Sequence, residues 1–255
     1  MSKRNLIQTL FLVLTSAFLT SVIVLGKNSI HSICPYAVIC FGMLKGNLLT
    51  LSLGLASVGI FFGILFMILA MFWGRVFCSY VCPLGTIQEL LYRITHKKRL
   101  RQIPLFAERK LNKIKYFVLG ISIILVICGF AWLYIKLCPF YSLSLLPRLV
   151  YLGLFTILVI VIGGVFLERF WCRFLCPYAA LLIVSQILGG LFGIKRKKIR
   201  RNMECCTDCG ICNLNCPMNL DILCDEYVES IDCIMCDRCA EKCPKHGTIT
   251  KEREQ

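Results

Sequence analysis

Two cysteine runs near the end of the chain have the spacing that binds iron–sulfur clusters. Each run reads C-x2-C-x2-C-x3-C-P, and the runs begin at Cys206 and Cys233. In bacterial two-cluster ferredoxins, three thiolates of such a run hold one [4Fe–4S] cluster and the fourth cysteine reaches the other cluster. Zinc sites and disulfide frameworks are the alternatives, but a zinc site does not add a third cysteine after two further residues. The spacing therefore predicts electron transfer through two clusters. The expected ligands are Cys206, Cys209, Cys212 and Cys243 for the first cluster, and Cys233, Cys236, Cys239 and Cys216 for the second.

A second cysteine motif, C-x3-C-P, occurs twice earlier in the chain. Residues four apart share one face of a helix, so each cysteine pair should point one way, and the proline should end the preceding helix. Pseudo-symmetry would bring the four thiols together, and nearby arginines would favour thiolate over thiol. The motif predicts another iron–sulfur or metal centre or a redox-active dithiol pair; the alternative is four small, buried apolar side chains. The cysteines are Cys78, Cys82, Cys172 and Cys176, and the arginines are Arg75, Arg169 and Arg173.

The remaining cysteines give weaker signals. Cys34 and Cys138 each precede a proline, one in each copy of an internal repeat, and are candidates for a disulfide or a metal pair with Cys40 as a third member. Three others are not expected to be ligands: Cys128, Cys205 and Cys224.

These motifs must be positioned by a chain that is more apolar than an ordinary globular domain. Hydrophobic residues make up 58% of it, and its mean hydropathy is +0.75. Four uncharged stretches, 6–25, 47–73, 116–135 and 149–167, are long enough or nearly long enough to cross a bilayer. A fifth apolar stretch, 178–194, has a fifth membrane crossing as one interpretation. Because it corresponds in the repeat to the amphipathic segment 84–94, it is expected instead to lie at the membrane face or to pack on the bundle. The predicted fold is an all-α membrane bundle of four transmembrane helices with a parallel internal repeat, plus a small α+β ferredoxin-like domain.

The same patterns predict three parts of the chain. A four-span membrane domain covers 1–194 and contains repeat A, 1–101, and repeat B, 116–194, each with one C-x3-C-P motif. A basic linker, 195–203, and the two-cluster ferredoxin domain, 204–255, follow.

The net charge of +15 has an explanation that does not require nucleic acid. Lysine and arginine gather beside the apolar stretches, where anionic lipid headgroups attract them, whereas the ferredoxin segment is acidic. Their distribution predicts a multi-pass protein of the bacterial cytoplasmic (inner) membrane with both termini in the cytoplasm. Membrane lipid is therefore an expected partner, and nucleic acid is not.

The motifs also resemble a known family. The segments F-C-S-Y-V-C-P-L-G at 77–85 and W-C-R-F-L-C-P-Y at 171–178, together with the two ferredoxin runs, look like the NapH-type membrane iron–sulfur proteins, which are related to the polyferredoxin part of NosR-type proteins. The resemblance implies four spans and a cytoplasmic ferredoxin with two [4Fe–4S] clusters. A related group, the CcoG-type proteins, is associated with copper reduction during oxidase assembly.

The expected function is a relay of single electrons between the quinone pool or a cytoplasmic donor and a respiratory or redox protein partner. The alternative is a metal-reducing or assembly factor for another redox complex. No catalytic residue is expected, because the pattern fits an electron carrier or a subunit of an oxidoreductase complex rather than a stand-alone enzyme. With only three histidines, none of them in an apolar stretch, the chain also excludes a bis-histidine haem within a helical bundle.

Overall fold

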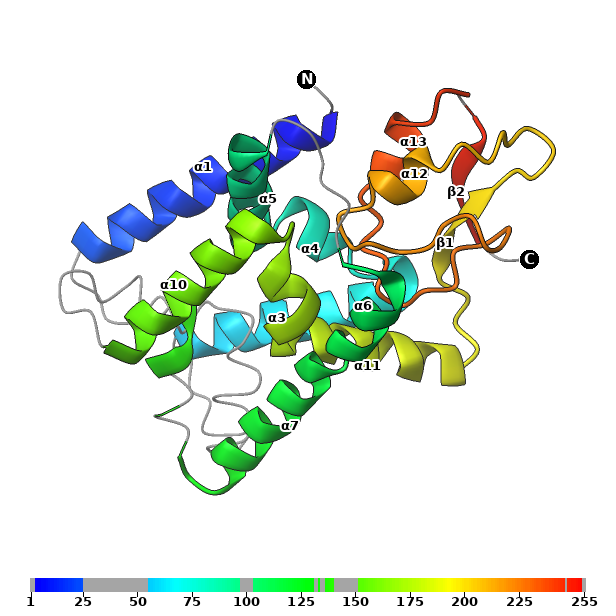
Figure 1. Ribbon diagram of the computed structural model, residues 1–255. Helices are drawn as coiled ribbons and strands as arrows, with labels where there is room; N and C mark the ends of the chain where they lie inside the picture. Colours follow the sequence, from blue (N-terminus) through cyan, green and yellow to red (C-terminus); the bar gives the residue numbers. More distant parts are fainter. Residues whose placement is uncertain are drawn as a thin grey trace.

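The computed structural model describes residues 3–24, 55–96, 103–130, 133, 136–139, 151–245 and 247–253. Most of these residues are helical, and one two-stranded sheet lies near the end of the chain (Figure 1). The described elements are α1 (Lys3–Val24), α3 (Leu55–Trp73), α4 (Val76–Tyr80), α5 (Pro83–Thr95), α6 (Leu105–Leu111), α7 (Ile114–Ile127), α10 (Tyr151–Phe166), the π-helical turn η3 (Trp171–Leu175), α11 (Pro177–Leu191), β1 (Lys197–Arg201), α12 (Ile211–Leu214), α13 (Arg238–Glu241) and β2 (Ile249–Arg253).

The helices from α1 to α11 form one part of the molecule, here called the helical half. Helix α11 packs against α3 and α7, helix α10 packs against α5, and α1 contacts α4 and α5. Ala180, Leu182 and Ile183 on α11 are fully buried, so this helix is part of the core of the helical half. The sequence did not decide whether the segment 178–194 lies at the membrane face or packs on the bundle. The structure shows that α11, which occupies most of this segment, packs among other helices.

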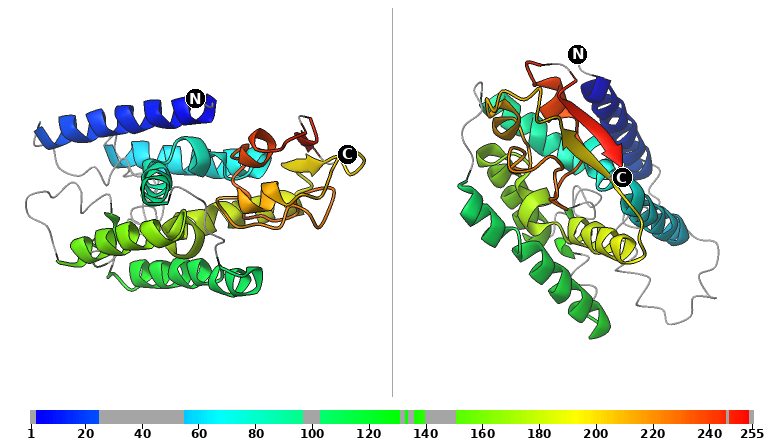
Figure 2. Two further views of the ribbon diagram at one scale, coloured as in Figure 1. Left: turned by 45° about the horizontal axis from the view of Figure 1, so that its top comes forward. Right: turned by 90° about the vertical axis from the view of Figure 1, so that its right-hand side faces the viewer.

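Residues 197–253, here called the head, lie at one end of the helical half (Figure 2). Strands β1 and β2 pair antiparallel, with Lys197 opposite Arg253 and Arg201 opposite Ile249. Side chains alternate across a strand, so Ile199 and Arg201 both face the interior while Arg200 faces outward. The segment predicted as a basic linker therefore contributes a strand to the head. The predicted boundaries of the domains and repeats stay predictions.

The prediction of a four-span membrane bundle is wrong for the part of the chain that the structure describes. None of the described helices combines the length and the apolar character that crossing a bilayer requires. Helices α7 and α10, which occupy two of the predicted spans, have 14 and 16 residues, short of the ~20 that a hydrocarbon core demands. Apolar composition alone did not reveal where these helices end. The cellular location stays a prediction.

Candidate iron–sulfur sites

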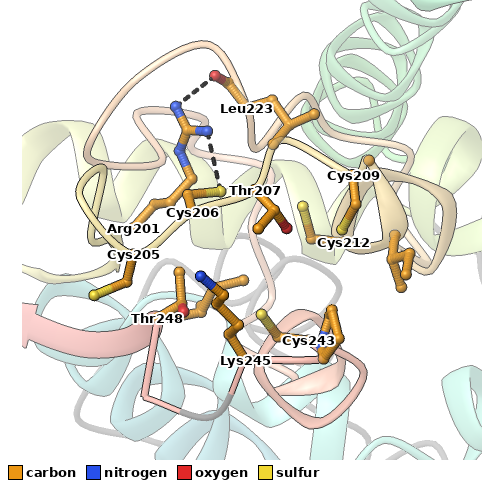
Figure 3. Close-up of a pocket in the computed structure, with 14 residues that line it drawn as sticks. Arg201, Cys205, Cys206, Thr207, Cys209, Cys212, Leu223, Cys243, Lys245 and Thr248 are labelled. Carbon is orange, nitrogen blue, oxygen red and sulfur yellow. Dashed lines mark hydrogen bonds between the residues drawn. The ribbon is translucent and has the colours of Figure 1, made fainter.

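The first ferredoxin run and the last cysteine of the second run surround one hollow, here called the outer hollow (Figure 3). Its sulfur-bearing residues are Cys206, Cys209, Cys212 and Cys243, with Cys205 at its edge. The loop turns tightly into α12 because Asp208 and Gly210 have positive φ angles of 49° and 73°, a conformation that glycine adopts without strain. Cys205 and Cys209 are exposed to solvent. The outer hollow is therefore open to an approaching molecule.

The second run and the last cysteine of the first run surround another hollow, here called the inner hollow. It is lined by Cys216, Cys233, Cys236 and Cys239 and by apolar side chains, among them Ile199, Met218 and Ile234. Cys236 and Cys239 are buried. None of its cysteines is exposed, unlike Cys209 at the outer hollow. It lies against the helical half, since Ile234 and Cys236 share a core with Ala70, Cys78, Tyr178 and Leu182.

Each hollow thus combines three cysteines of one run with the fourth cysteine of the other run. This is the crossed grouping that the spacing predicts, and it joins cysteines from distant parts of the head. The identity of the ligands themselves stays a prediction.

The linings of the two hollows suit a group that is held by soft sulfur ligands. Each lining brings at least four cysteines together with mostly apolar side chains. The cysteines around them are unbridged thiols, and thiolates are the ligands that iron–sulfur clusters use. Within the described ranges, no three His, Cys, Asp or Glu side chains form a site for a single metal ion.

Burial controls the protonation of the inner thiols. It raises the pKa of Cys216 to about 12 and that of Cys233 to about 11, and it raises the pKa of Cys239 well above its ordinary value. The thiols of Cys216, Cys233 and Cys239 are therefore neutral near pH 7 in the absence of a metal. Because a metal takes thiolate ligands, its binding must release their protons.

The C-x3-C-P cysteines also come together, but not as two positions on one continuous helix. Cys78 lies within α4, whereas Cys82 has extended backbone angles and precedes α5. In the same way, Cys172 lies within η3 and Cys176 precedes α11. The proline that follows each second cysteine begins the next helix, as expected. All four thiols are near enough for Cys78, Cys82 and Cys176 to raise the pKa of Cys172.

Arg75 and Arg169 act to favour the thiolate of Cys78, in the predicted direction, but burial has the larger effect and raises the pKa of this thiol to about 12. The arginines are engaged elsewhere. Arg75 pairs with Asp232, and Arg169 pairs with Glu89 at 2.8 Å. Arg173 forms a buried pair with Glu108.

The weaker cysteine candidates are placed as follows. Cys138 is buried, while Cys34 and Cys40 lie outside the described residues, so their predicted pairing is not tested. Cys128 and Cys224 are exposed, and the Cys224 thiol donates to Asp221 at 2.8 Å. In Figure 3 the sulfur of Cys205 points away from Cys212 and Cys243.

Comparison with known proteins supports an iron–sulfur cofactor. A family model described as a 4Fe-4S binding domain matches the chain twice, at residues 55–102 and 149–198, which are the segments that carry the two C-x3-C-P motifs. YccM of Escherichia coli (strain K12), a candidate electron transport protein, is 33% identical over 195 residues, which are 72% of this chain and 53% of YccM. An uncharacterized protein of Methanocaldococcus jannaschii is 28% identical over 95% of this chain and 92% of its own length. The regulatory protein NosR of Pseudomonas aeruginosa is 29% identical over 71% of this chain and 26% of NosR.

The chain belongs to the NapH/NosR-type iron–sulfur protein family. The resemblance seen in the motifs is thereby confirmed, and so are an iron–sulfur cofactor and a general role in electron transport. The chain spans only about half the length of YccM. No solved structure matches it.

In this NapH/NosR-type chain, buried ion pairs fasten the head to the helical half. Arg238, the residue before Cys239, donates to Glu168 at 2.5 Å and to Glu89 at 2.7 Å. Asp232, the residue before Cys233, pairs with Arg75 at 3.0 Å and with Lys115. The second ferredoxin run is thus anchored directly before its first cysteine and again directly before its third.

Sequence reasoning missed these anchors. Glu168 is fully buried and binds Arg238. In the segment 84–94, which the sequence shows to be amphipathic, α5 turns Gln88 and Glu89 into the protein and exposes Leu90 and Ile94. A carboxylate and an amide between apolar neighbours mark one face of a helix, but they do not say which face is buried.

Proposed function

We propose that the chain relays single electrons between a partner redox protein and its own helical half, through two [4Fe–4S] clusters in the head. The observation that carries this proposal is the pair of hollows, each bordered by four cysteines drawn from both runs. One hollow has an exposed cysteine, and the other is packed against the helical half. When bound by four thiolates, such a cluster supplies one-electron transfer.

The residues around the outer hollow suit contact with another protein. Cys205 and Cys209 are exposed, and the neighbouring Glu204, Thr207 and Lys245 are also at the surface. A partner can therefore approach the outer sulfurs without any rearrangement of the head. We place the exchange with a partner protein at this hollow.

The residues around the inner hollow suit transfer within the molecule. Cys216 and Cys236 pack in the same core as Cys78 and Cys176, so no solvent layer separates the inner hollow from the C-x3-C-P thiols. Tyr80 adds a hydrogen bond of 2.7 Å to Asp237, between the second and third cysteines of the run. These contacts hold the inner cysteines at a fixed distance from the helical half, which a reproducible transfer rate requires.

The four C-x3-C-P cysteines are the proposed continuation of the relay, as a further iron–sulfur centre or a redox-active group of thiols. Their mutual proximity and their packing beside the inner hollow support this assignment. The predicted quinone and lipid partners stay predictions. The alternative role in metal reduction or assembly stays a prediction. Copper binding by the cysteines Cys34 and Cys138 would favour it, and Cys34 lies outside the described residues.

The cluster number is tested by anaerobic purification of the full chain, followed by iron and sulfide analysis and EPR of the reduced protein. We expect about eight iron atoms from the head, because two [4Fe–4S] clusters hold four each, and more if the C-x3-C-P cysteines hold a centre. Replacing Cys206 and Cys209 with serine should remove one EPR signal and about four iron atoms.

Cys224→Ser is the matched control, since Cys224 is exposed and borders neither hollow. It should leave the iron content unchanged. A purified chain without sulfide, or a Cys206/Cys209 double variant with full iron content, would refute the proposal.

A further inference from the structure

Two adjacent arginines of β1 have opposite environments. Arg201 is 3% exposed and borders the outer hollow. Arg200 points to the opposite face of the strand, where it is 41% exposed and pairs with Glu226 and Glu252. Because side chains alternate along a strand, one buried guanidinium is directed at the cysteines while its neighbour stays in solvent.

The guanidinium of Arg201 contacts a predicted cluster ligand directly. Its Nη1 lies 3.5 Å from Cys206 Sγ and 2.6 Å from Asp208 Oδ1, and its Nη2 donates to the Leu223 carbonyl at 2.8 Å (Figure 3). Its Nε is buried and has no hydrogen-bond partner among the described residues. The guanidinium is thus fixed by a carboxylate and a backbone carbonyl in a position where it donates to a sulfur.

The carboxylate in this group does not cancel the effect of the guanidinium. Asp208 lies 3.7 Å from Cys206 Sγ, but its side chain is 73% exposed. Water screens an exposed charge much more than a buried one, so the field at the sulfur is dominated by Arg201. In the inner hollow, the corresponding contact is a neutral one, from the Leu220 backbone N–H to Cys216 Sγ at 3.5 Å.

Hydrogen bonds to the sulfurs and the local net charge are two factors that set the reduction potential of an iron–sulfur cluster. Reduction adds negative charge, so a nearby cation that donates an N–H to a ligand sulfur stabilises the reduced form. We propose that Arg201 is a positioning residue that raises the reduction potential of the cluster in the outer hollow through its hydrogen bond to Cys206. The inference rests on the proposed two-cluster function. Its consequence is that an electron resides preferentially at the exposed site, where a partner can collect it.

The test is an anaerobic redox titration of the full-length protein followed by EPR, on the unmodified chain and on Arg201→Gln. The outer signal is identified beforehand as the one that Cys206→Ser removes. In Arg201→Gln we expect the outer potential to fall by at least 59 mV, which is a tenfold change in the equilibrium constant of a one-electron reduction. The inner potential should stay within the scatter of the measurement. Arg200→Gln is the matched control and should change neither potential.

A purely structural role for Arg201 would give a different result. Arg201→Lys keeps the charge but cannot donate to both Cys206 and Leu223, so we expect a shift of the same sign and smaller size. If Arg201→Gln binds no outer cluster, the outer reduction potential of Arg201→Lys is the measurement that tests the inference. An unchanged outer potential, or equal shifts at both clusters, would overturn the inference. Absence of both EPR signals from the unmodified chain would instead overturn the two-cluster function.

Discussion

The anchor between the head and the helical half gives a stability prediction. Replacing Arg238 with glutamine removes one guanidinium that joins two buried carboxylates, those of Glu89 and Glu168. Glu89 keeps three other arginine partners, Arg4, Arg93 and Arg169. The main loss therefore falls on Glu168, which is fully buried.

Removing one member of a buried ion pair costs ~3–5 kcal/mol, because the remaining charge stays out of water. We expect Arg238→Gln to lower the free energy of unfolding by about this amount, measured by urea denaturation under anaerobic conditions. Adding Glu168→Gln to Arg238→Gln should restore part of the loss, since the buried carboxylate that faced Arg238 is then replaced by a neutral amide. The double-mutant cycle measures this coupling.

The control for this experiment is Lys251→Gln. Lys251 pairs with Asp237 next to Arg238, but both side chains are about one-third exposed, so its loss should cost at most about 1 kcal/mol. A loss below 1 kcal/mol in Arg238→Gln, or strictly additive effects in the double variant, would refute the view that this bridge anchors the head.

Two further predictions concern the surroundings of the C-x3-C-P motifs. In Gly85→Ala the new methyl would lie 3.0 Å from the Cys78 carbonyl oxygen and 3.2 Å from Arg169 Nη1, so thermal denaturation should show a loss of ~1–3 kcal/mol. Gly120→Ala on α7, where nothing lies within 4 Å, should instead be neutral or stabilising by up to ~1 kcal/mol; equal effects would contradict the packing described here. Burial acts to raise the pKa of Glu89, but Arg169, Arg238 and Arg4 outweigh it and hold the pKa well below the ordinary 4.5. In acid, the unfolded chain therefore binds more protons than the folded chain. The free energy of unfolding should fall as the pH drops below about 4.5. A Glu89→Gln variant with the same acid dependence would show that this carboxylate is not responsible.

The sequence predicted the cysteine grouping of the head because short, fixed spacings determine local geometry. Cys206, Cys209 and Cys212 cannot be far apart, and the crossing of Cys216 and Cys243 follows from the known ferredoxin pattern. The convergence of the C-x3-C-P cysteines was also foreseen, because the motif occurs twice in equivalent positions.

Long-range contacts could not be predicted in the same way. The partners of Arg238 lie 70 and 149 residues away, and no pattern within one segment records such a pairing. Arg201 was counted as one of a run of basic residues, because its direction depends on strand pairing with β2. The membrane spans were inferred from apolar composition, which does not reveal where each helix is interrupted.

The crossed arrangement of the cysteines also constrains how the protein is made. A nascent chain that has not yet reached Cys233 offers only Cys216 to the inner hollow, and until Cys243 emerges the outer hollow has three of its four thiols. With the proposed ligand sets, complete iron insertion has to wait until both runs have left the ribosome and folded together. A premature stop between the runs would leave both sites incomplete rather than spare the first.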